Sequence, residues 1–342
     1  MGVCCFGPHI DKEKLIPIDE FTKLIPKEIY NKMNLKSDID NKNYKTTKEE
    51  VIYSKGKETF YYHGEYVNNQ MDGKGYLVIV NQEQKPTIYQ GIWEYGKITS
   101  GKIYYIDGSL YEGDIVNYIP SGKGKLISDT EKYEGDWKNN KKDGKGKLTN
   151  SSGIMYEGEF KNDAFSGQGK MIWKNGTKYE GAFLNNQFHG FGCLTGQNSH
   201  VYSGNFVNGL FHGEGQFEWN EENNNINTKQ TYKGNYSLGK KNGHGKFTFK
   251  DGNTFDGMWE SGEPHGEGIF ETKNRKYHGN WRAGQFIQVI KIEDITKEEE
   301  NVDLNFEVPN EDIVIKDSLR NSISSVLSSR AEETPFTYEV VV

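Results

Sequence analysis

Most of the chain alternates between aromatic or small residues and charged residues. Residues 133–137 read Tyr-Glu-Gly-Asp-Trp, and residues 144–148 read Gly-Lys-Gly-Lys-Leu. Because alternate residues of a β-strand point to opposite faces, each stretch has an aromatic or glycine face and a charged face. The polar segment between them, Asn139 to Asp143, is typical of a turn. The pattern therefore predicts a β-hairpin with one packing face and one solvated face.

This hairpin pattern recurs with a nearly fixed period. Successive copies begin mostly 22 or 23 residues apart, which predicts a repeat array whose units pack only on their neighbours. Copies open at Tyr62, Tyr89, Tyr111, Tyr133, Tyr156, Tyr179, Tyr202, Tyr232 and Phe255, with a half copy at Tyr277. The residues that define the repeat are Tyr62, Gly64, Tyr111, Gly113, Tyr133, Gly135, Trp137, Gly144, Gly146, Tyr156, Gly158, Tyr179, Gly181, Tyr202, Gly204, Tyr232, Gly234, Gly257 and Trp259.

The motif Y-x-G-x-[WF] followed by G-x-G-x-[LMF] resembles the MORN repeat family. The resemblance covers about two-thirds of the chain, from Phe60 to Phe286, in nine full copies and a partial tenth. It implies an all-β fold: an elongated single-layer antiparallel sheet of about nine to ten hairpins. Two copies depart from the motif. In the second, Gly101 is followed at the next motif position by Ile103 rather than by a second glycine, and in the ninth Phe255 replaces the leading tyrosine.

The two faces of each hairpin have different expected roles. On the packing face, glycines leave bare backbone on which rings from a neighbouring hairpin can lie. On the solvated face, acids of one strand oppose lysines of the next, and each such pair contributes roughly 0.2–1 kcal/mol.

The composition divides the chain into three regions. Residues 1–58 are expected to hold short helices between about 17 and 35, the second starting at Pro26, and a polar linker over 37–58. Residues 59–290 form the array, with a final strand at about 286–292. Residues 291–342 hold an acidic linker and an amphipathic helix. The apolar positions of that helix are Ile315, Leu319, Ile323, Val326 and Leu327.

The N-terminus carries a lipidation-like motif. Gly2 follows a removable methionine, as N-myristoylation requires, and Cys4 and Cys5 are candidate palmitoylation sites. A single acyl chain binds membranes only marginally, so the adjacent cysteines would supply the second signal. Phe6 departs from the motif, which prefers Ser or Thr there. The alternative is an ordinary chain end with two incidental cysteines.

Charge and motif spacing argue against several classes of chemistry. The net charge of −7 comes from the acidic segment 293–312, and no basic block suggests nucleic-acid binding. No apolar run reaches the ~20 residues that span a bilayer. The glycine-rich segments lack the strand–helix context of nucleotide-binding loops. His189, His212 and His265 each precede a repeat glycine and are interpreted as turn residues, so we expect no metal, no cofactor and no catalytic site.

One spot on the solvated face lacks charge. Ala182, Phe191 and Cys193 stand where other copies carry acids or lysines, and Met258 and Ile269 continue the apolar character further along. An exposed apolar patch on a soluble surface is typical of a protein contact. These residues are therefore the candidate contact with a protein partner.

The expected function is a non-enzymatic, membrane-anchored scaffold on the cytosolic face of a plasma, cortical or ciliary membrane. The family resemblance implies links to membrane–cytoskeleton tethering, ciliary structures and phospholipid binding, and the array edges could pair with a second copy. Two alternatives remain open: a soluble axonemal structural protein, and a regulatory relative of phosphatidylinositol phosphate kinases. The segment after the array is too short for a kinase domain.

Overall fold

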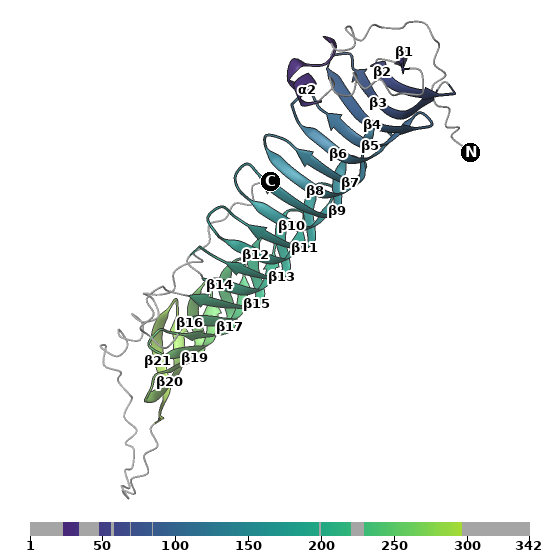
Figure 1. Ribbon diagram of the computed structural model, residues 1–342. Helices are drawn as coiled ribbons and strands as arrows, with labels where there is room; N and C mark the ends of the chain where they lie inside the picture. The colour runs from purple at the N-terminus through teal and green to yellow at the C-terminus, as the bar shows by residue number, and fades with distance from the viewer. Residues whose placement is uncertain are drawn as a thin grey trace, which may run out of the picture. The chain divides into compact units, whose positions relative to one another are not determined.

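The protein is all-β, with antiparallel strands following one another in chain order. The computed structural model describes residues 23–33, 48–55, 58–68, 70–83, 85–197, 200–219 and 229–295. They divide into two compact units between Ala164 and Phe165. The predicted fold class, an open antiparallel sheet of repeated hairpins, is confirmed in both units (Figure 1).

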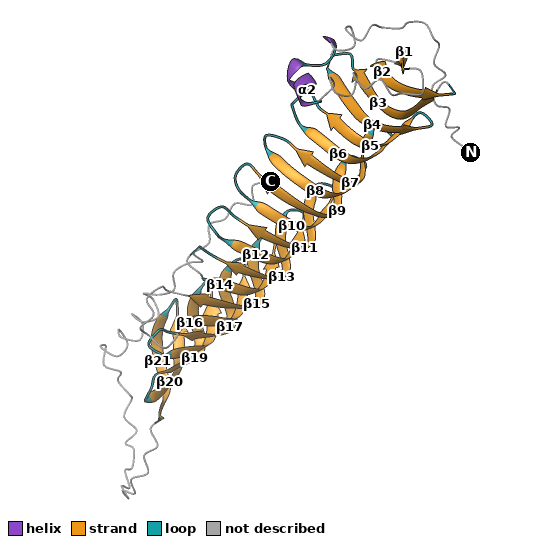
Figure 2. Cartoon of the chain, viewed as in Figure 1, coloured by secondary structure: helices purple, strands orange, loops and turns teal. Residues whose placement is uncertain are grey.

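The first unit has one described helix and ten strands, each strand pairing with the next (Figures 1 and 2). The elements are α2 (Lys27–Lys32), β1 (Lys48–Lys55), β2 (Glu58–Val67), β3 (Gln70–Val80), β4 (Pro86–Glu94), β5 (Lys97–Tyr104), β6 (Leu110–Val116), β7 (Ile119–Ile127), β8 (Glu131–Lys138), β9 (Lys141–Asn150) and β10 (Met155–Lys161).

The second unit continues the same pattern with eleven strands, again paired in sequence order. They are β11 (Ala164–Ile172), β12 (Lys178–Leu184), β13 (Gln187–Thr195), β14 (Val201–Val207), β15 (Leu210–Trp219), β16 (Gln230–Ser237), β17 (Lys240–Thr248), β18 (Thr254–Glu260), β19 (Glu263–Glu271), β20 (Arg275–Arg282) and β21 (Gln285–Asp294).

The turn inside each repeat is tighter than the sequence suggests. Between β8 and β9 it consists only of Asn139 and Asn140, with φ of 50° and 64°. Positive φ at both positions defines the type I′ turn, which matches the twist of a hairpin and favours asparagine and glycine. The predicted loop from Asn139 to Asp143 is thus too long, because Asp143 already lies in β9. The Asn140 N–H donates to the carbonyl of Pro120 at 2.9 Å and ties this turn to the preceding hairpin.

The N-terminal region differs from the expected helix-and-linker arrangement. Pro26 precedes α2 as predicted, at its N-cap. However, β1 pairs with β2 along its whole length, so the predicted linker over 37–58 is wrong for residues 48–55. Helix α2 lies beside the first strands of the sheet (Figure 1). Ile29 of α2, with Ile25 before it and Met33 after it, packs against residues of β3, β4 and β5. This apolar contact covers the face of β3 opposite to Leu77, and β3 is therefore buried on both sides.

The second copy has one residue fewer between its motif tyrosine and its last motif glycine than the fourth copy has. Gly101 pairs with Gly91, as Gly146 pairs with Gly135 in the fourth copy. Gly101 is therefore the second glycine of the motif, not the first as predicted. Ile103 lies opposite Tyr89 and takes the place of the aliphatic residue that ends the motif.

At the other end of the array, the predicted last strand over 286–292 is present as β21. The strand begins one residue earlier and ends two residues later than predicted, at Gln285 and Asp294. Strand β16 begins at Gln230, the last residue of the sequence insertion Glu221–Gln230 between the seventh and eighth copies. The lipidation motif (Gly2, Cys4, Cys5), the acidic linker beyond Ile295 and the C-terminal amphipathic segment lie outside the described residues.

Candidate interaction surface

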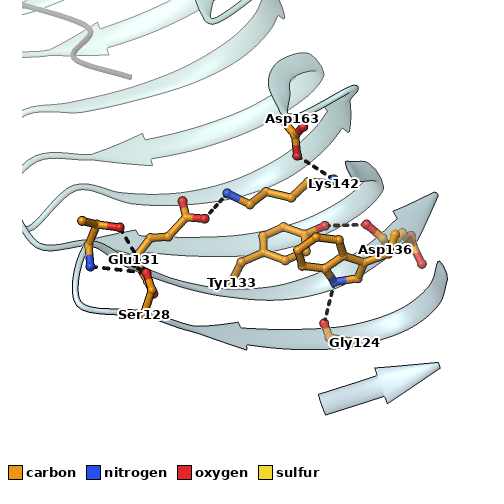
Figure 3. Close-up of polar contacts among 9 residues, drawn as sticks. Gly124, Ser128, Glu131, Tyr133, Asp136, Lys142 and Asp163 are labelled. Carbon is orange, nitrogen blue, oxygen red and sulfur yellow. Dashed lines mark hydrogen bonds and ion pairs between the residues drawn. The ribbon is translucent and has the colours of Figure 1, made fainter. Parts of the chain in front are cut away.

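Most repeats are built around a tyrosine that lies on a pair of glycines. Tyr133 lies over Gly135 of its own strand and Gly146 of the next, where a methyl group added to either glycine would come within 2.5 Å of a Tyr133 atom. Its hydroxyl donates to the carbonyl of Asp136 at 2.9 Å (Figure 3). The strand bulges between Gly135 and Trp137, and the hydroxyl satisfies the carbonyl in that bulge. The ring therefore comes from the same hairpin, not from a neighbouring hairpin as the sequence analysis predicted.

The same hydroxyl-to-carbonyl bond recurs across the array. In seven copies the tyrosine donates to the carbonyl three residues ahead, at 2.7–3.2 Å, whereas Tyr89 of the second copy donates to the carbonyl of Tyr118 at 3.1 Å. The donors are Tyr62, Tyr111, Tyr133, Tyr156, Tyr179, Tyr202 and Tyr232. In the ninth copy Phe255 keeps the ring over Gly257 without a hydroxyl. The motif tyrosine thus packs on the glycines and also donates a hydrogen bond to a backbone carbonyl. The spacing of the motif did not reveal this second role.

Neighbouring repeats are joined by edge-to-face ring contacts on the packing face of the sheet, which we call the inner face. We call the opposite, solvated face the outer face. The centroid of the Trp137 ring lies 5.2 Å from that of Tyr133 and 5.3 Å from that of Tyr111 in the preceding copy. Phe160 of the following copy lies 5.0 Å from Tyr133. Such contacts contribute about 0.5–1.5 kcal/mol each beyond area burial. Burial also raises the pKa of Tyr133 well above its ordinary value, so the inner face is neutral wherever tyrosines form it.

Two lysines interrupt this neutral inner face. Lys142 in β9 is only 8% exposed, and its ammonium group forms an ion pair with Glu131 and lies 5.5 Å from the centroid of the Tyr133 ring (Figure 3). Lys241 in β17 is 7% exposed. Burial lowers the pKa of Lys241 from its ordinary 10.5 to about 7.

The Lys241 ammonium lies among four aromatic rings. The ring centroids are 4.7 to 5.5 Å from its Nζ. A cation over a ring face is attracted by the ring quadrupole, which partly offsets the loss of water. The rings are Trp219 in β15, Tyr232 in β16, Phe247 in β17 and Trp259 in β18.

The outer face of the sheet carries ladders of opposite charge, as predicted. The ion pair between Lys147 and Glu157 spans 3.1 Å and joins one copy to the next. Asp136 accepts the backbone N–H of Lys145 at 2.8 Å and pairs with Lys123, whose hydrogen bond lowers the pKa of the Asp136 carboxyl. The lysines of these pairs are well exposed, so each pair contributes about 0–1 kcal/mol.

The charge ladder is interrupted in the second unit at the spot singled out from the sequence, although charged pairs such as Lys170 with Glu180 lie beside it. Phe191 is 65% exposed and pairs with Asn205, and Cys193 lies between Ser203 of β14 and Glu180 of β12. The Ala182 Cβ lies about 3.5 Å from the Cβ position of Gly190. At the matching positions of the first unit, lysine opposes glutamate. The predicted outward placement of Ala182, Phe191 and Cys193 is therefore correct, and Phe191 is the most exposed of the three.

The array is recognisable as a known repeat. The sequence model of the MORN repeat matches eight segments that together make up more than half of the chain. The chain belongs to the MORN repeat family. The matched segments are residues 62–83, 111–130, 133–155, 156–178, 179–201, 202–222, 232–254 and 255–275. The copies that open at Tyr89 and Tyr277 lie outside them, yet both form the same antiparallel hairpins, β4–β5 and β20–β21.

MORN repeats are generally non-catalytic and form a scaffold suited to protein or lipid interaction. In the described part of this MORN array, no cluster of three or more metal-ligating side chains is found. His189, His212 and His265 lie in strands rather than in turns, which corrects the interpretation as turn residues. Each still precedes a glycine with φ between 60° and 66°. No described helix is long and apolar enough to cross a membrane.

Proposed function

We propose that this MORN protein is a non-enzymatic scaffold that is held at a cytosolic membrane face by its acylated N-terminus and binds a protein partner through the outer face of the second unit. The observation that carries the proposal is the interruption of the outer charge ladder at Phe191. A large exposed ring whose cross-strand neighbour is the uncharged Asn205 loses water favourably when a partner covers it.

The position of this patch suits a contact that does not disturb the fold. Phe191 lies on the opposite face of β13 from Phe188 and Leu194, which are buried on the inner face. A substitution at Phe191 therefore changes the surface and leaves the aromatic packing intact. Aromatic anchors of this kind commonly supply a large share of the binding energy of an interface.

The first experiment is capture of partners from a cell extract by the full-length protein and by Phe191→Glu. The matched control is Ile92→Glu, which places the same charge on an outer-face residue of β4 that is 48% exposed. Loss of specific partners with Phe191→Glu but not with Ile92→Glu supports the patch. Equal capture by both variants and by the unaltered protein contradicts it.

Attachment to a membrane is tested separately. We expect Gly2→Ala, and Cys4→Ser combined with Cys5→Ser, to lose fatty-acid labelling and become cytosolic, since stable attachment needs two lipid signals. Unchanged localisation without lipid incorporation would favour the alternative, a soluble ciliary or axonemal component retained with microtubules. Stimulation of a phosphatidylinositol phosphate kinase by the pure protein would favour the regulatory relative. Sedimentation of the pure protein tests pairing of array edges into a homo-oligomer.

A further inference from the structure

The two inner-face lysines occupy the same position of the repeat. Lys142 lies opposite Trp137 in its hairpin, and Lys241 lies opposite Tyr236 in its own. The other described copies place an apolar residue or a proline there, so a lysine is not needed to build the hairpin. Those residues are Met71, Ile98, Pro120, Phe165, Phe188, Phe211, Pro264 and Phe286.

The two lysines differ in their counter-charge. Lys142 is paired with Glu131, which stands two residues before the motif tyrosine of its copy. At the same position of the eighth copy stands Gln230, a neutral residue that is 6% exposed. Among the described residues, no carboxylate forms an ion pair with Lys241. The repeat thus retains the buried cation but lacks the anion that accompanies it four copies earlier.

The described groups around Lys241 supply no substitute for this anion. Burial raises the pKa values of Tyr232 and Tyr236 in β16, so both are neutral phenols. In β15 Glu218 is already engaged with Lys229 at 3.8 Å. In β18 Glu260 pairs with His265 of β19 at 3.2 Å. A buried ammonium ion without a counter-ion is unfavourable, and an anion placed beside it would relieve that penalty.

We propose that Lys241 is the binding site for an external anionic oxygen group, a carboxylate or a phosphate, which takes the place that Glu131 takes beside Lys142. The aromatic rings hold the lysine chain in position, and the ammonium group supplies the hydrogen-bond donors. The site is on the inner face and is separate from the outer patch at Phe191, so it does not depend on the proposed function. Because burial places the pKa of Lys241 near 7, anion binding takes up a proton and strengthens as the pH falls through neutrality.

The test is an NMR titration of the full-length protein with lysine labelled at Cε, which reports the protonation of Lys241. The probes are sodium acetate and inorganic phosphate, each compared with sodium chloride at equal ionic strength. We expect at least one probe to raise the pKa of Lys241 by about one unit at saturation, which corresponds to a roughly tenfold preference for the charged amine. A response to acetate alone assigns a carboxylate partner, and a response to phosphate alone assigns a phosphate group. No response to either probe overturns the proposal.

Reciprocal exchange of the counter-charge gives matched controls. Gln230→Glu should supply the missing carboxylate, raise the pKa of Lys241 and abolish its response to the probes, whereas Gln230→Asn should leave the response unchanged. Glu131→Gln should give Lys142 a response that it lacks in the unaltered protein. A response that persists in Gln230→Glu would mean that the probes act elsewhere and would overturn the assignment.

One further variant separates an external anion from an internal one. Glu221 and Glu222 lie in the insertion that follows Trp219 in the sequence. In Glu221→Gln combined with Glu222→Gln, we expect the pKa of Lys241 and its response to the probes to stay the same. A fall in that pKa, with a larger response to the probes, would show that the insertion itself supplies the anion and would overturn an external ligand.

Discussion

The buried lysine of the eighth repeat makes stability depend on pH in a defined direction. In the unfolded chain Lys241 has a pKa near 10.5, and in the folded protein burial lowers its pKa to about 7. Between these values the unfolded state binds more protons than the folded state. The free energy of unfolding therefore rises with pH from about 7 to about 10.5, and the penalty for the buried charge is fully present below pH 7.

The size of the effect follows from the shift. A difference of about 3.5 pKa units corresponds to an upper limit of about 5 kcal/mol at ~1.4 kcal/mol per unit. Each ring around the ammonium returns roughly 0.5–2 kcal/mol of cation–π attraction to the charged form. Lys241→Met keeps the length of the side chain and removes the charge. Four rings return at least about 2 of the ~5 kcal/mol, so we expect Lys241→Met to stabilise the second unit by up to about 3 kcal/mol at pH 6, and by about 1 kcal/mol or less at pH 10.

The assay is urea unfolding followed by tryptophan fluorescence at pH 6, 7, 8, 9 and 10, in a buffer free of carboxylate and phosphate. Trp219 and Trp259 contact Lys241 and report on its surroundings. The control is Lys240→Met, which removes the adjacent exposed ammonium group and should change the unfolding free energy by less than ~0.5 kcal/mol at each pH. If the gain from Lys241→Met were the same at pH 6 and pH 10, a penalty for the buried charge could not be its cause.

Two further predictions concern the packing that builds the array. Tyr133→Phe keeps the ring on its glycines but removes the hydrogen bond to the Asp136 carbonyl, and urea unfolding should show that the free energy of unfolding falls by about 1–2 kcal/mol. The converse substitution, Phe255→Tyr, should cause no loss of stability. A larger loss in Phe255→Tyr than in Tyr133→Phe would contradict this role of the hydroxyl. Ile29→Asp places a charge in the contact between α2 and the sheet, and it should release α2 while β3 and β4 stay paired. Hydrogen exchange would show faster exchange in α2 alone, and equal loss of protection in the strands would refute this independence.

Much of the fold could be predicted because the same pattern of alternating residues recurs in copy after copy. The alternation of Tyr133, Gly135 and Trp137 with acids assigns the two faces of a strand, and the fixed period assigns the hairpins to an array. The outward placement of Phe191 follows from the same alternation. The linker prediction failed at residues 48–55 because it overlooked Val51, Ile52 and Tyr53, three strand-favouring residues that pair with the edge of β2.

Other features depend on contacts that no spacing reveals. Whether a ring lies on its own hairpin or on the next is decided by the bulge after Gly135, which turns the Asp136 carbonyl toward the Tyr133 hydroxyl. The register of the second copy, with Gly101 opposite Gly91, is likewise fixed by strand pairing and not by the order of glycines along the chain.

The sequence by itself determined the fold class, the repeat length and the two faces of the sheet, because these depend on local periodicity. Only the tertiary structure distinguished the two inner-face lysines. In sequence both appear as ordinary lysines after a turn, but burial of a charge and the presence of a counter-ion depend on residues from neighbouring strands. Those strands place Glu131 beside Lys142 and four aromatic rings around Lys241.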